Sequence, residues 1–407
     1  MRRVPMVERP GWLSTVEAQG LAYAVECQRD GSVRPYWHEG HAYELTEPEV
    51  DYLDDVTGHL HRMCVEASRH VLADDRLWAS LCLPEQARHL LDWSLRNEQA
   101  WTLYGRFDLA WDPDGGPAKM LEYNADTPAG LVEAAVCQWG WLEDRLPGND
   151  QWNLLHELLV KRWAVLGACI PGGTVHLAVG QDEPTEDWCT VAYLSDTATE
   201  AGLQVVRTTM ESIGWDERRR RFIGPRSDRD DIGAAFKMYP WEWMLDEAFG
   251  EHILDGYTGT RWIEPAWKAL AGSKTLLVAL WECFPGNDFL LPAQLDEPGP
   301  WMGYVRKPVY GWEGAGVEVV TPDFRYGLDP KHTAGQRNVY QAYHPIRRFD
   351  GAQPILGTWV IGGRPAGLGI RESDGHVTDT GARFVPHYMT TPRSTPEQVA
   401  AWVGGEG

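Results

Sequence analysis

Residues 103–111 read LYGRFDLAW and residues 118–125 read AKMLEYNA, and the connection DPDGGP lies between them. Both stretches have the composition of short strands, and a linking segment rich in Asp, Pro and Gly is typical of a β-hairpin with a longer loop. We therefore expect two antiparallel strands here. They carry the sharpest group of polar residues in the chain.

Four polar side chains occur on these strands in pairs. Arg106 and Asp108 are two positions apart, as are Glu122 and Asn124, so each pair projects from one face of its strand. Across a hairpin the two faces can meet and bring two carboxylates and an amide oxygen together. Such hard oxygen ligands hold Mg²⁺ with phosphates, and Arg106 suits an anionic substrate or a transferring phosphoryl group. Surface pairing of Arg with Asp and of Glu with Asn is the alternative that this spacing leaves open.

A cluster of this kind has a consequence for stability. Asp108 and Glu122 repel each other if no cation lies between them. We therefore expect slight strain in the metal-free cluster, and little loss of stability when Glu122 is replaced by Gln.

Helices surround the hairpin in the sequence. A capping box, Thr46 to Glu49, begins an amphipathic helix, and a second helix follows over about 84–97. After the hairpin, Thr127 and Pro128 have the types of an N-cap and first helical residue, and a further helix is expected over about 150–167.

The remaining chain alternates between strand and helix patterns. Residues 174–180, 187–201 and 204–210 predict a β-α-β unit with a small parallel sheet. Residues 240–284 are helical in pattern and rich in Trp. The last third alternates short strands with glycine turns, which indicates a mixed or antiparallel sheet. The fold class expected is α/β.

Composition narrows the function. The 407 residues include 43% hydrophobic residues, enough for a full-sized core, and 37 Lys and Arg against 59 Asp and Glu give a net charge of −22. This charge disfavours nucleic-acid and anionic-membrane partners, and no apolar run approaches the ~20 residues of a membrane span. The seven cysteines contain no CxxC pair, so neither a zinc site nor a disulfide framework is indicated. We expect a cytoplasmic protein.

Three further basic residues are candidates for anion binding. Lys307 lies on a strand followed by a Gly-rich turn with Gly311 and Gly314, where the backbone can approach a phosphate. Lys274 stands at the start of a helix, a position that favours anions. Arg371 follows an apolar strand. A hairpin with a surface lysine explains Lys307 equally well, and a lone Lys274 or Arg371 signals little by itself.

A series of motifs in one order resembles a known family. The segments RFD, EYNADTP, DQWN, ESIGW, KMYPWEWM, EPAWK, YVRKPVYG and GLGIRES are similar to those of the glutathionylspermidine synthase-like family, in particular its stand-alone synthetase members without an amidase domain. The similarity runs from about residue 10 to 390. It implies an ATP-grasp-like fold with ATP between tightly joined lobes, and ligation of a small-molecule carboxylate to an amine through an acyl-phosphate.

The resemblance also assigns roles. It implies that the Mg²⁺ ligands are Asp108, Glu122 and Asn124, and that the arginines on the substrate side are Arg106 and Arg371. The residues that it implies around ATP are Lys274, Lys307, Gly311, Gly314 and Gln341. The expected acid is peptide-like, similar to glutathione, and the amine is a polyamine such as spermidine. Ala129 stands where glutathionylspermidine synthetases have a serine, and Trp312 and Gly316 replace an expected Arg and Asn.

The whole chain, 1–407, is expected to form one synthetase region. Approximate internal lobes are 1–170 with the metal-binding hairpin, 171–215 with the small parallel sheet, and 216–407 with the ATP-grasp-like part. Two other functions remain open: a catalytically silent ATP- or polyamine-binding module, and a phosphotransferase that needs no acceptor amine.

Overall fold

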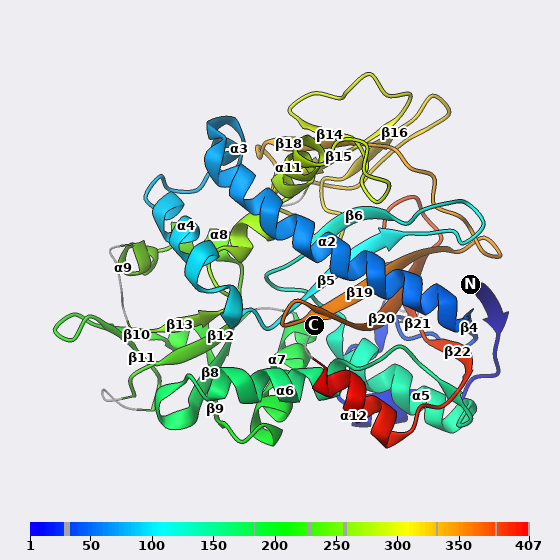
Figure 1. The fold of residues 1–407 in the computed structure, drawn as a ribbon, viewed down its shortest axis with the longest axis horizontal. Coiled ribbons are helices and arrows are strands. Elements are labelled where there is room, and N and C mark those ends of the chain that lie inside the picture. Colours follow the sequence, from blue (N-terminus) through cyan, green and yellow to red (C-terminus); the bar gives the residue numbers. More distant parts are fainter. Residues whose placement is uncertain are drawn as a thin grey trace.

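The hairpin forms one edge of a five-stranded antiparallel sheet in the computed structural model, which describes residues 1–27, 33–182, 184–226, 230–254, 259–330, 333–378 and 381–405. Its strand order is β21-β20-β19-β5-β6. The hairpin supplies β5 (Tyr104–Ala110) and β6 (Lys119–Asn124), which confirms the prediction. The other three strands come from far along the chain: β19 (Gln353–Ile361), β20 (Arg364–Ser373) and β21 (Arg383–Val385). The sheet thus joins the two ends of the sequence (Figure 1).

Side chains alternate between the two faces of this sheet because the strand period is two. Phe107 and Leu109 belong to a core cluster with helix α2, whereas Tyr104 belongs to a second cluster with helices α5 and α6. Arg106 and Asp108 share the parity of Tyr104 and lie on the face away from α2. The polar pairs therefore project from the face opposite to the one that packs against α2.

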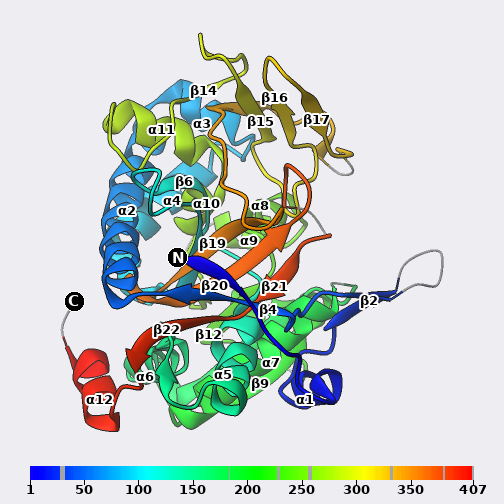
Figure 2. The same cartoon turned by 90° about the vertical axis from the view of Figure 1, so that its right-hand side faces the viewer.

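Helix α2 (Glu47–Ala73) covers the first face, as Figures 1 and 2 show. The predicted capping box at Thr46 and Glu49 is present, and the helix buries an apolar stripe that includes Leu53, Leu60 and Val71. Helix α6 (Leu155–Gly167) and a π-helical turn, Glu133–Cys137, pack on the other face.

A second five-stranded antiparallel sheet lies above the hairpin in Figure 1, with the order β14-β18-β15-β16-β17. Its strands are β14 (Ala293–Leu295), β18 (Asn338–Ala342), β15 (Tyr304–Pro308), β16 (Glu318–Val320) and β17 (Arg325–Gly327). Helix α11 (Thr275–Cys283) packs between this sheet and α2. The strands of the last third pair antiparallel, except that β22 (His387–Pro392) also pairs in parallel with β4 (His41–Leu45), which agrees with the expected mixed or antiparallel pattern.

The predicted β-α-β unit is confirmed. Strands β8 (Thr174–Val179) and β9 (Gln204–Thr209) pair in parallel and are joined by α7 (Thr185–Glu200). Two later strands, β12 (Ala234–Met238) and β13 (Arg261–Ile263), complete the sheet in the order β13-β12-β8-β9. Since β13 falls in the segment expected to be helical, that prediction was incomplete.

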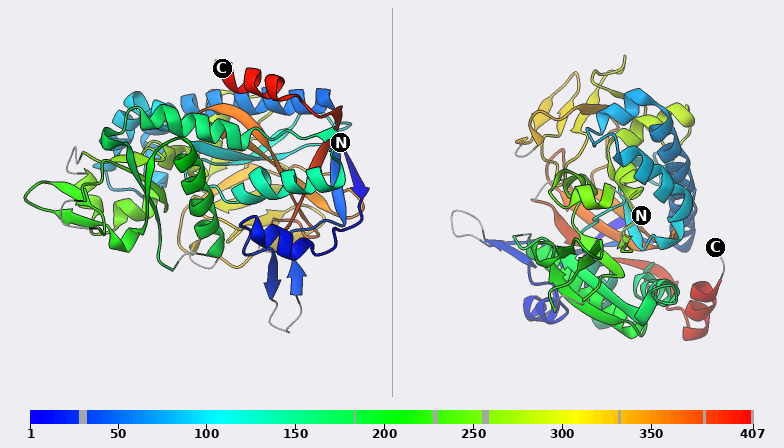
Figure 3. Two further views of the ribbon diagram at one scale, coloured as in Figure 1. Left: turned by 90° about the horizontal axis from the view of Figure 1, so that it is seen from below. Right: turned by 90° about the vertical axis from the view of Figure 1, so that its left-hand side faces the viewer.

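The remaining elements surround these sheets. A four-stranded sheet contains β1 (Arg2–Pro5), β4 (His41–Leu45), β22 (His387–Pro392) and β7 (Asn149–Asp150). Two-stranded ribbons are β2 (Val25–Cys27) with β3 (Val33–Pro35), which projects from the body in Figure 3, and β10 (Gly214–Asp216) with β11 (Arg221–Ile223). The other α-helices are α1 (Trp12–Ala18), α3 (Asp75–Ser80), α4 (Ala87–Asn97), α5 (Gln138–Arg145), α8 (Trp241–Asp246), α9 (Gly250–Leu254), α10 (Lys268–Gly272) and α12 (Pro396–Gly404). Short 3₁₀ turns occur at Gln99–Trp101, Pro171–Gly173 and Met210–Ser212.

One helix start was predicted wrongly. Thr127 and Pro128 lie in a loop, and the helical stretch begins only after Gly130, whose φ is +86°. The residues between Asn124 and Gly130 instead make contacts with the functional site, described below. None of the helices in the described ranges combines the length and apolar composition that crossing a membrane requires.

Candidate active site

The hairpin register brings the four polar residues together in two cross-strand pairs. Asp108 lies opposite Glu122, and Arg106 lies opposite Asn124. A β-bulge follows Asp108, so the regular pairing resumes only at Leu109 and Met120. Bulges commonly re-aim side chains beside active sites. The predicted juxtaposition is therefore present, and Asn124 Nδ2 is 3.4 Å from Glu122 Oε1.

Asp108 is held by both predicted arginines. Arg106 donates from Nε to Oδ1 at 2.7 Å and from Nη2 to Oδ2 at 3.2 Å, and Arg371 donates from Nη2 to Oδ2 at 2.6 Å. Arg106 Nη1 also donates to the backbone oxygen of Ala129. The sequence spacing did not show that Arg371, on β20, reaches this carboxylate.

The two lysines reach the hairpin from the second sheet and from α11. Lys274 caps the start of α11, and its Nζ lies 3.4 Å from Glu122 Oε2 and donates to the Gly311 oxygen at 2.8 Å. Lys307 on β15 donates to the Leu121 oxygen at 2.7 Å and to Gln341 Oε1 at 2.8 Å.

Gln341 completes this contact between the two sheets. Its Nε2 donates to the Met120 oxygen at 3.1 Å, and its side chain is buried. Lys307 and Gln341 together bind two backbone oxygens of β6. The structure thus brings all the predicted basic residues, the carboxylates and Gln341 around one hairpin.

The expected repulsion between the carboxylates is absent, and that prediction was wrong. Asp108 is compensated by two arginines and Glu122 by Lys274. Burial works against the ionised form of Glu122, but Lys274 and then Lys307 hold its pKa down at about 2. Burial lowers the pKa of Lys307 to about 8, although Glu122 favours its charged form.

A pocket lies between the hairpin and the second sheet. Its floor includes Asp108, Glu122, Lys274, Lys307 and Gln341. Its walls are mostly apolar or belong to the Gly-rich turn: Leu291, Val305, Val317, Val319 and Ile346, and Gly311, Trp312, Glu313, Gly314 and Ala315. A charged floor under apolar walls suits a ligand with an anionic end and a flat apolar end.

The Gly-rich turn needs glycine for a packing reason. Gly314 has a φ of +70°, and a Cβ there would lie 3.0 Å from the Thr378 oxygen and 2.8 Å from Leu328 Cδ1. Trp312 extends along the same turn and makes an edge-on ring contact with Trp243, at 5.2 Å between centroids. The turn is therefore packed closely over the pocket.

A buried acidic group beside the arginines was missed from the sequence. Glu133, in the π-helical turn, is fully buried, and its Oε1 accepts hydrogen bonds from Tyr23 at 2.9 Å and Tyr36 at 2.6 Å. Its Oε2 is buried and has no hydrogen-bond partner within the part of the chain that the structure describes. Burial raises the pKa of Glu133, and burial with the nearby Glu133 charge raises the pKa of Glu186 to about 8. The charges of Arg371 and Arg106 act in the opposite direction on the pKa of Glu186.

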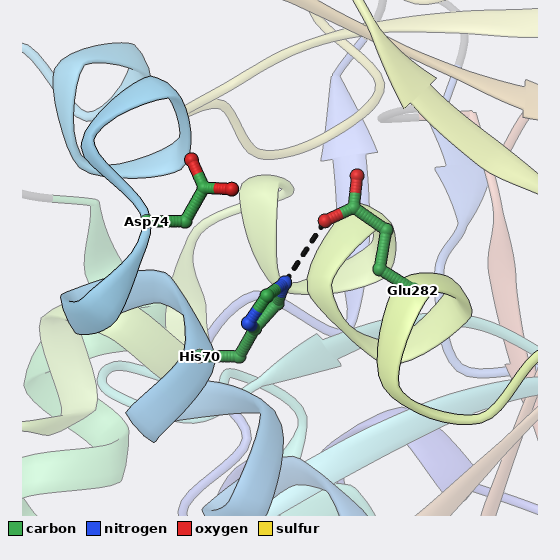
Figure 4. Close-up of side chains that lie close together, drawn as sticks. All are labelled: His70, Asp74 and Glu282. Atoms are coloured by element: carbon green, nitrogen blue, oxygen red, sulfur yellow. Dashed lines mark hydrogen bonds and ion pairs between the residues drawn. The ribbon is translucent and has the colours of Figure 1, made fainter.

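A separate cluster is formed by His70 of α2, Asp74 at the start of α3 and Glu282 of α11 (Figure 4). His70 Nε2 is 2.9 Å from Glu282 Oε2, and Arg76 donates to Glu282 Oε1 at 2.6 Å. Asp74 Oδ1 caps α3 by accepting the amides of Arg76 and Leu77. These contacts account for the cluster as a link between α2, α3 and α11.

Comparison with known proteins assigns this arrangement to a family. The family model described as glutathionylspermidine synthase preATP-grasp matches residues 3–390, and the chain belongs to that family. A Haemophilus influenzae protein with the provisional name acid–amine ligase is 37% identical over 395 residues, covering 94% of this chain and 97% of that protein. Trypanothione synthetase of Crithidia fasciculata is 27% identical, covering 80% of this chain and 53% of its own length. The bifunctional glutathionylspermidine synthetase/amidase of Escherichia coli is 26% identical, with 88% and 60% covered.

These relatives confirm the expected enzyme class, an acid–amine ligase similar to glutathionylspermidine synthase. The chain spans between about half and three fifths of the two larger synthetases. A solved structure from Methylobacillus flagellatus KT, provisionally named a gamma-glutamylcysteine synthetase, superposes with a TM-score of 0.45 at 13% identity, covering 77% of this chain and 91% of that one. That similarity is too weak to define a shared fold.

Proposed function

We propose that the protein is a Mg²⁺- and ATP-dependent ligase that joins the carboxylate of a peptide-like acid to a cationic amine through an acyl-phosphate. The observation that carries this proposal is the convergence of four cationic side chains on one hairpin: Arg106 and Arg371 pair with Asp108, Lys274 pairs with Glu122, and Lys307 binds the backbone oxygen of Leu121 between them. Family membership supports the same reaction class.

The nucleotide is proposed to lie in the pocket between the two five-stranded sheets, in an ATP-grasp-like manner. Lys274 donates to a backbone oxygen of the Gly-rich turn, and Lys307 donates to the Leu121 backbone oxygen of the hairpin and to the Gln341 amide oxygen on β18. Phosphate oxygens offer the same type of acceptor with more charge, so both amines can exchange partners. The apolar walls formed by Val305, Val317 and Val319 suit the base.

The residues present fit a Mg²⁺ ion. Glu122 keeps its carboxylate ionised, and neither the Glu122 nor the Asn124 side chain is fully buried, so both have oxygens that a cation can approach. We propose these two as ligands with Asp108, whose oxygens are shared with the two arginines. Such an ion neutralises the charge that develops on the phosphates.

The protein's own part in the chemistry is positioning and charge compensation. The acid carboxylate attacks the γ-phosphorus of ATP, and ADP leaves as the acyl-phosphate forms. The amine nitrogen then attacks the acyl carbon, so a C–N bond forms, the bond to phosphate breaks and the amine loses a proton. Arg106 and Arg371, already held by Asp108, are placed to stabilise the negative charge in both steps.

The buried acidic group supports a cationic amine. Among the described residues, Glu133 Oε2 has no hydrogen-bond partner, and the charge of Glu133 contributes to the raised pKa of Glu186. The net charge of −22 attracts cations generally. The Escherichia coli relative is named a glutathionylspermidine synthetase, and spermidine is a polyamine.

The test is ADP release from Mg²⁺-ATP with a panel of acids, including glutathione, and a panel of amines, including spermidine. We expect release that requires both an acid and an amine. Release with the acid alone indicates a phosphotransferase, and ATP binding without release from any pair indicates a silent binding module. Either of those outcomes contradicts the proposal.

A further inference from the structure

Two motifs in the chain, KMYPWEWM and EPAWK, contribute no residue to the lining of the pocket described above. Each carries a lysine, Lys237 and Lys268, whose side chain is fully buried. A buried ammonium group is costly unless it is paired and hydrogen-bonded. Both lysines find their partners at the ends of the hairpin.

Lys268 fixes the hairpin where both strands meet the rest of the chain. Its Nζ donates to the Tyr104 oxygen at 3.1 Å and to the Ala125 oxygen at 3.0 Å. Tyr104 begins β5, and Ala125 directly follows Asn124. The Glu264 carboxylate lies 3.3 Å from Lys268 Nζ, and its Oε1 accepts the amides of Leu103 and Tyr104 at 2.9 Å.

Lys237 binds Asp126, the residue that follows Ala125 in the sequence. Its Nζ lies 2.5 Å from Asp126 Oδ1, and Asp126 Oδ2 accepts the Trp241 amide at 3.0 Å. The Trp241 indole donates to the Glu264 backbone oxygen at 3.0 Å, which joins the two lysine contacts into one network. We call Lys237, Lys268, Asp126, Glu264 and Trp241 the hairpin-end network.

The loop that leaves this network also touches the site. Three residues after Asp126, the Ala129 oxygen accepts a hydrogen bond from Arg106. A shift at Asp126 therefore displaces both Asn124 on one side and the Arg106 contact on the other. The surrounding residues must hold the side chains of such a site to within ~0.5 Å of the productive geometry.

We propose that Lys237 and Lys268 are positioning residues, which hold the end of β6 so that Asn124 and Arg106 are arranged for metal–nucleotide binding before the substrates arrive. This rests on the proposed function. Neither lysine touches the pocket lining, so each acts through the hairpin.

The experiment compares Lys237→Met and Lys268→Met with Arg9→Met. Arg9 forms a similarly buried pair, with Nη2 2.6 Å from Glu39 Oε1, and none of its contacts involves the hairpin. Each of the three variants leaves a buried carboxylate without its cationic partner and should melt at a lower temperature than wild type. The readouts, at a temperature where each variant is folded, are hydrogen–deuterium exchange and the affinity for AMPPNP with Mn²⁺ and in EDTA.

We expect faster exchange at residues 119–130 in both lysine variants, and also at the start of β5 in Lys268→Met, because Lys268 binds the Tyr104 oxygen. The affinity for Mn²⁺-AMPPNP should fall about tenfold, the scale for outer-shell supports of metal sites. Affinity in EDTA should change less than threefold, because Lys274 and Lys307 are intact. Arg9→Met should show neither effect. Asp126→Asn, which keeps the shape of the side chain, serves if a lysine variant does not fold.

Lysine variants that match Arg9→Met in both readouts overturn the positioning role. If the wild type itself fails to bind AMPPNP, the proposed function fails, and the exchange data still decide whether the lysines hold the hairpin.

Discussion

Arg371 Nη2 lies 2.6 Å from Asp108 Oδ2, so a strand near the end of the chain completes an ion pair that Arg106 begins on β5. The contact crosses the five-stranded sheet from β20 to β5 and passes over β19. It places two guanidinium groups on one buried carboxylate.

Replacing Arg371 should affect turnover far more than stability. In Arg371→Met, Asp108 keeps its contacts with Arg106, so we expect only a small fall in melting temperature. Turnover should fall by at least ~10²-fold, the scale for one lost electrostatic contact in a transition state. Steady-state ADP release and a melting curve measure the two effects. Arg383→Met, which removes contacts with Glu372 and Asp374 away from the pocket, is the control and should show the reverse pattern.

Glu122→Gln should destabilise the metal-free protein, contrary to the expectation from sequence. The pKa of Glu122 is depressed to about 2, so its charge stabilises the fold above the unfolded pKa of about 4.5, and this contribution is lost as pH falls through 2. The substitution removes it at neutral pH, and we expect about 1–3 kcal/mol in urea unfolding with EDTA. An unchanged or raised midpoint contradicts the charge compensation by Lys274 and Lys307.

Nucleotide binding should take up a proton near pH 8. The pKa of Lys307 is lowered to about 8 mainly by burial, and phosphates favour its charged form, so binding raises that pKa. The affinity for ATP should therefore decline as pH rises above about 8. Calorimetry in buffers of different ionisation enthalpy measures the uptake. Lys307→Arg, which stays charged, should bind without it, and equal uptake in both proteins excludes Lys307 as the source.

The same lowered pKa has a consequence for folding. Because the pKa of Lys307 is about 8 in the fold and 10.5 as the ordinary value, the unfolded chain binds more protons between these limits. The contribution of this lysine to stability therefore rises with pH from about 8 to 10.5. The unfolding free energy of wild type should therefore rise relative to that of Lys307→Met between pH 8 and pH 10.5. A difference between the two proteins that stays constant over this range contradicts the lowered pKa.

Gly314→Ala should weaken ATP binding through the turn. A Cβ at position 314 would lie 3.0 Å from the Thr378 backbone oxygen, and an alanine there would have to adopt an unfavourable φ of +70°. Gly172→Ala is matched, since Gly172 has a φ of +75° but nothing within 4 Å of the added atom. The positive φ should cost each variant about 1 kcal/mol of stability, and Gly314→Ala should lose more because of its close contacts. Only Gly314→Ala should also raise the dissociation constant for ATP, as followed by a thermal-shift titration.

The sequence predicted local features well and long-range partners poorly. The hairpin and the shared faces of Arg106 with Asp108 and Glu122 with Asn124 follow from a strand period of two, and the structure has them. The positions of Lys274, Lys307 and Arg371 around the hairpin followed only from the family resemblance, because spacing within one strand says nothing of what another sheet brings to it.

The compensation of the two carboxylate charges is the clearest feature that the sequence did not predict. Two carboxylates on facing strands suggested repulsion, since the arginine on β20 and the lysine before α11 are not visible in the hairpin's own sequence. Glu133 with Tyr23 and Tyr36 was missed for the same reason: three residues from separate segments carry no common pattern. The helix predicted from Thr127 and Pro128 failed because Asp126 and Ala129 are drawn into contacts with Lys237 and Arg106.

The central claim is that an acyl-phosphate links ATP to amide formation. The most direct measurement uses an acid labelled with ¹⁸O in its carboxylate, with the acid–amine pair that supports ADP release, and follows the label into inorganic phosphate by mass spectrometry. We predict one ¹⁸O atom in phosphate for each amide formed, and loss of this transfer together with amide formation in Arg371→Met. Phosphate that carries no label while amide accumulates would contradict the account.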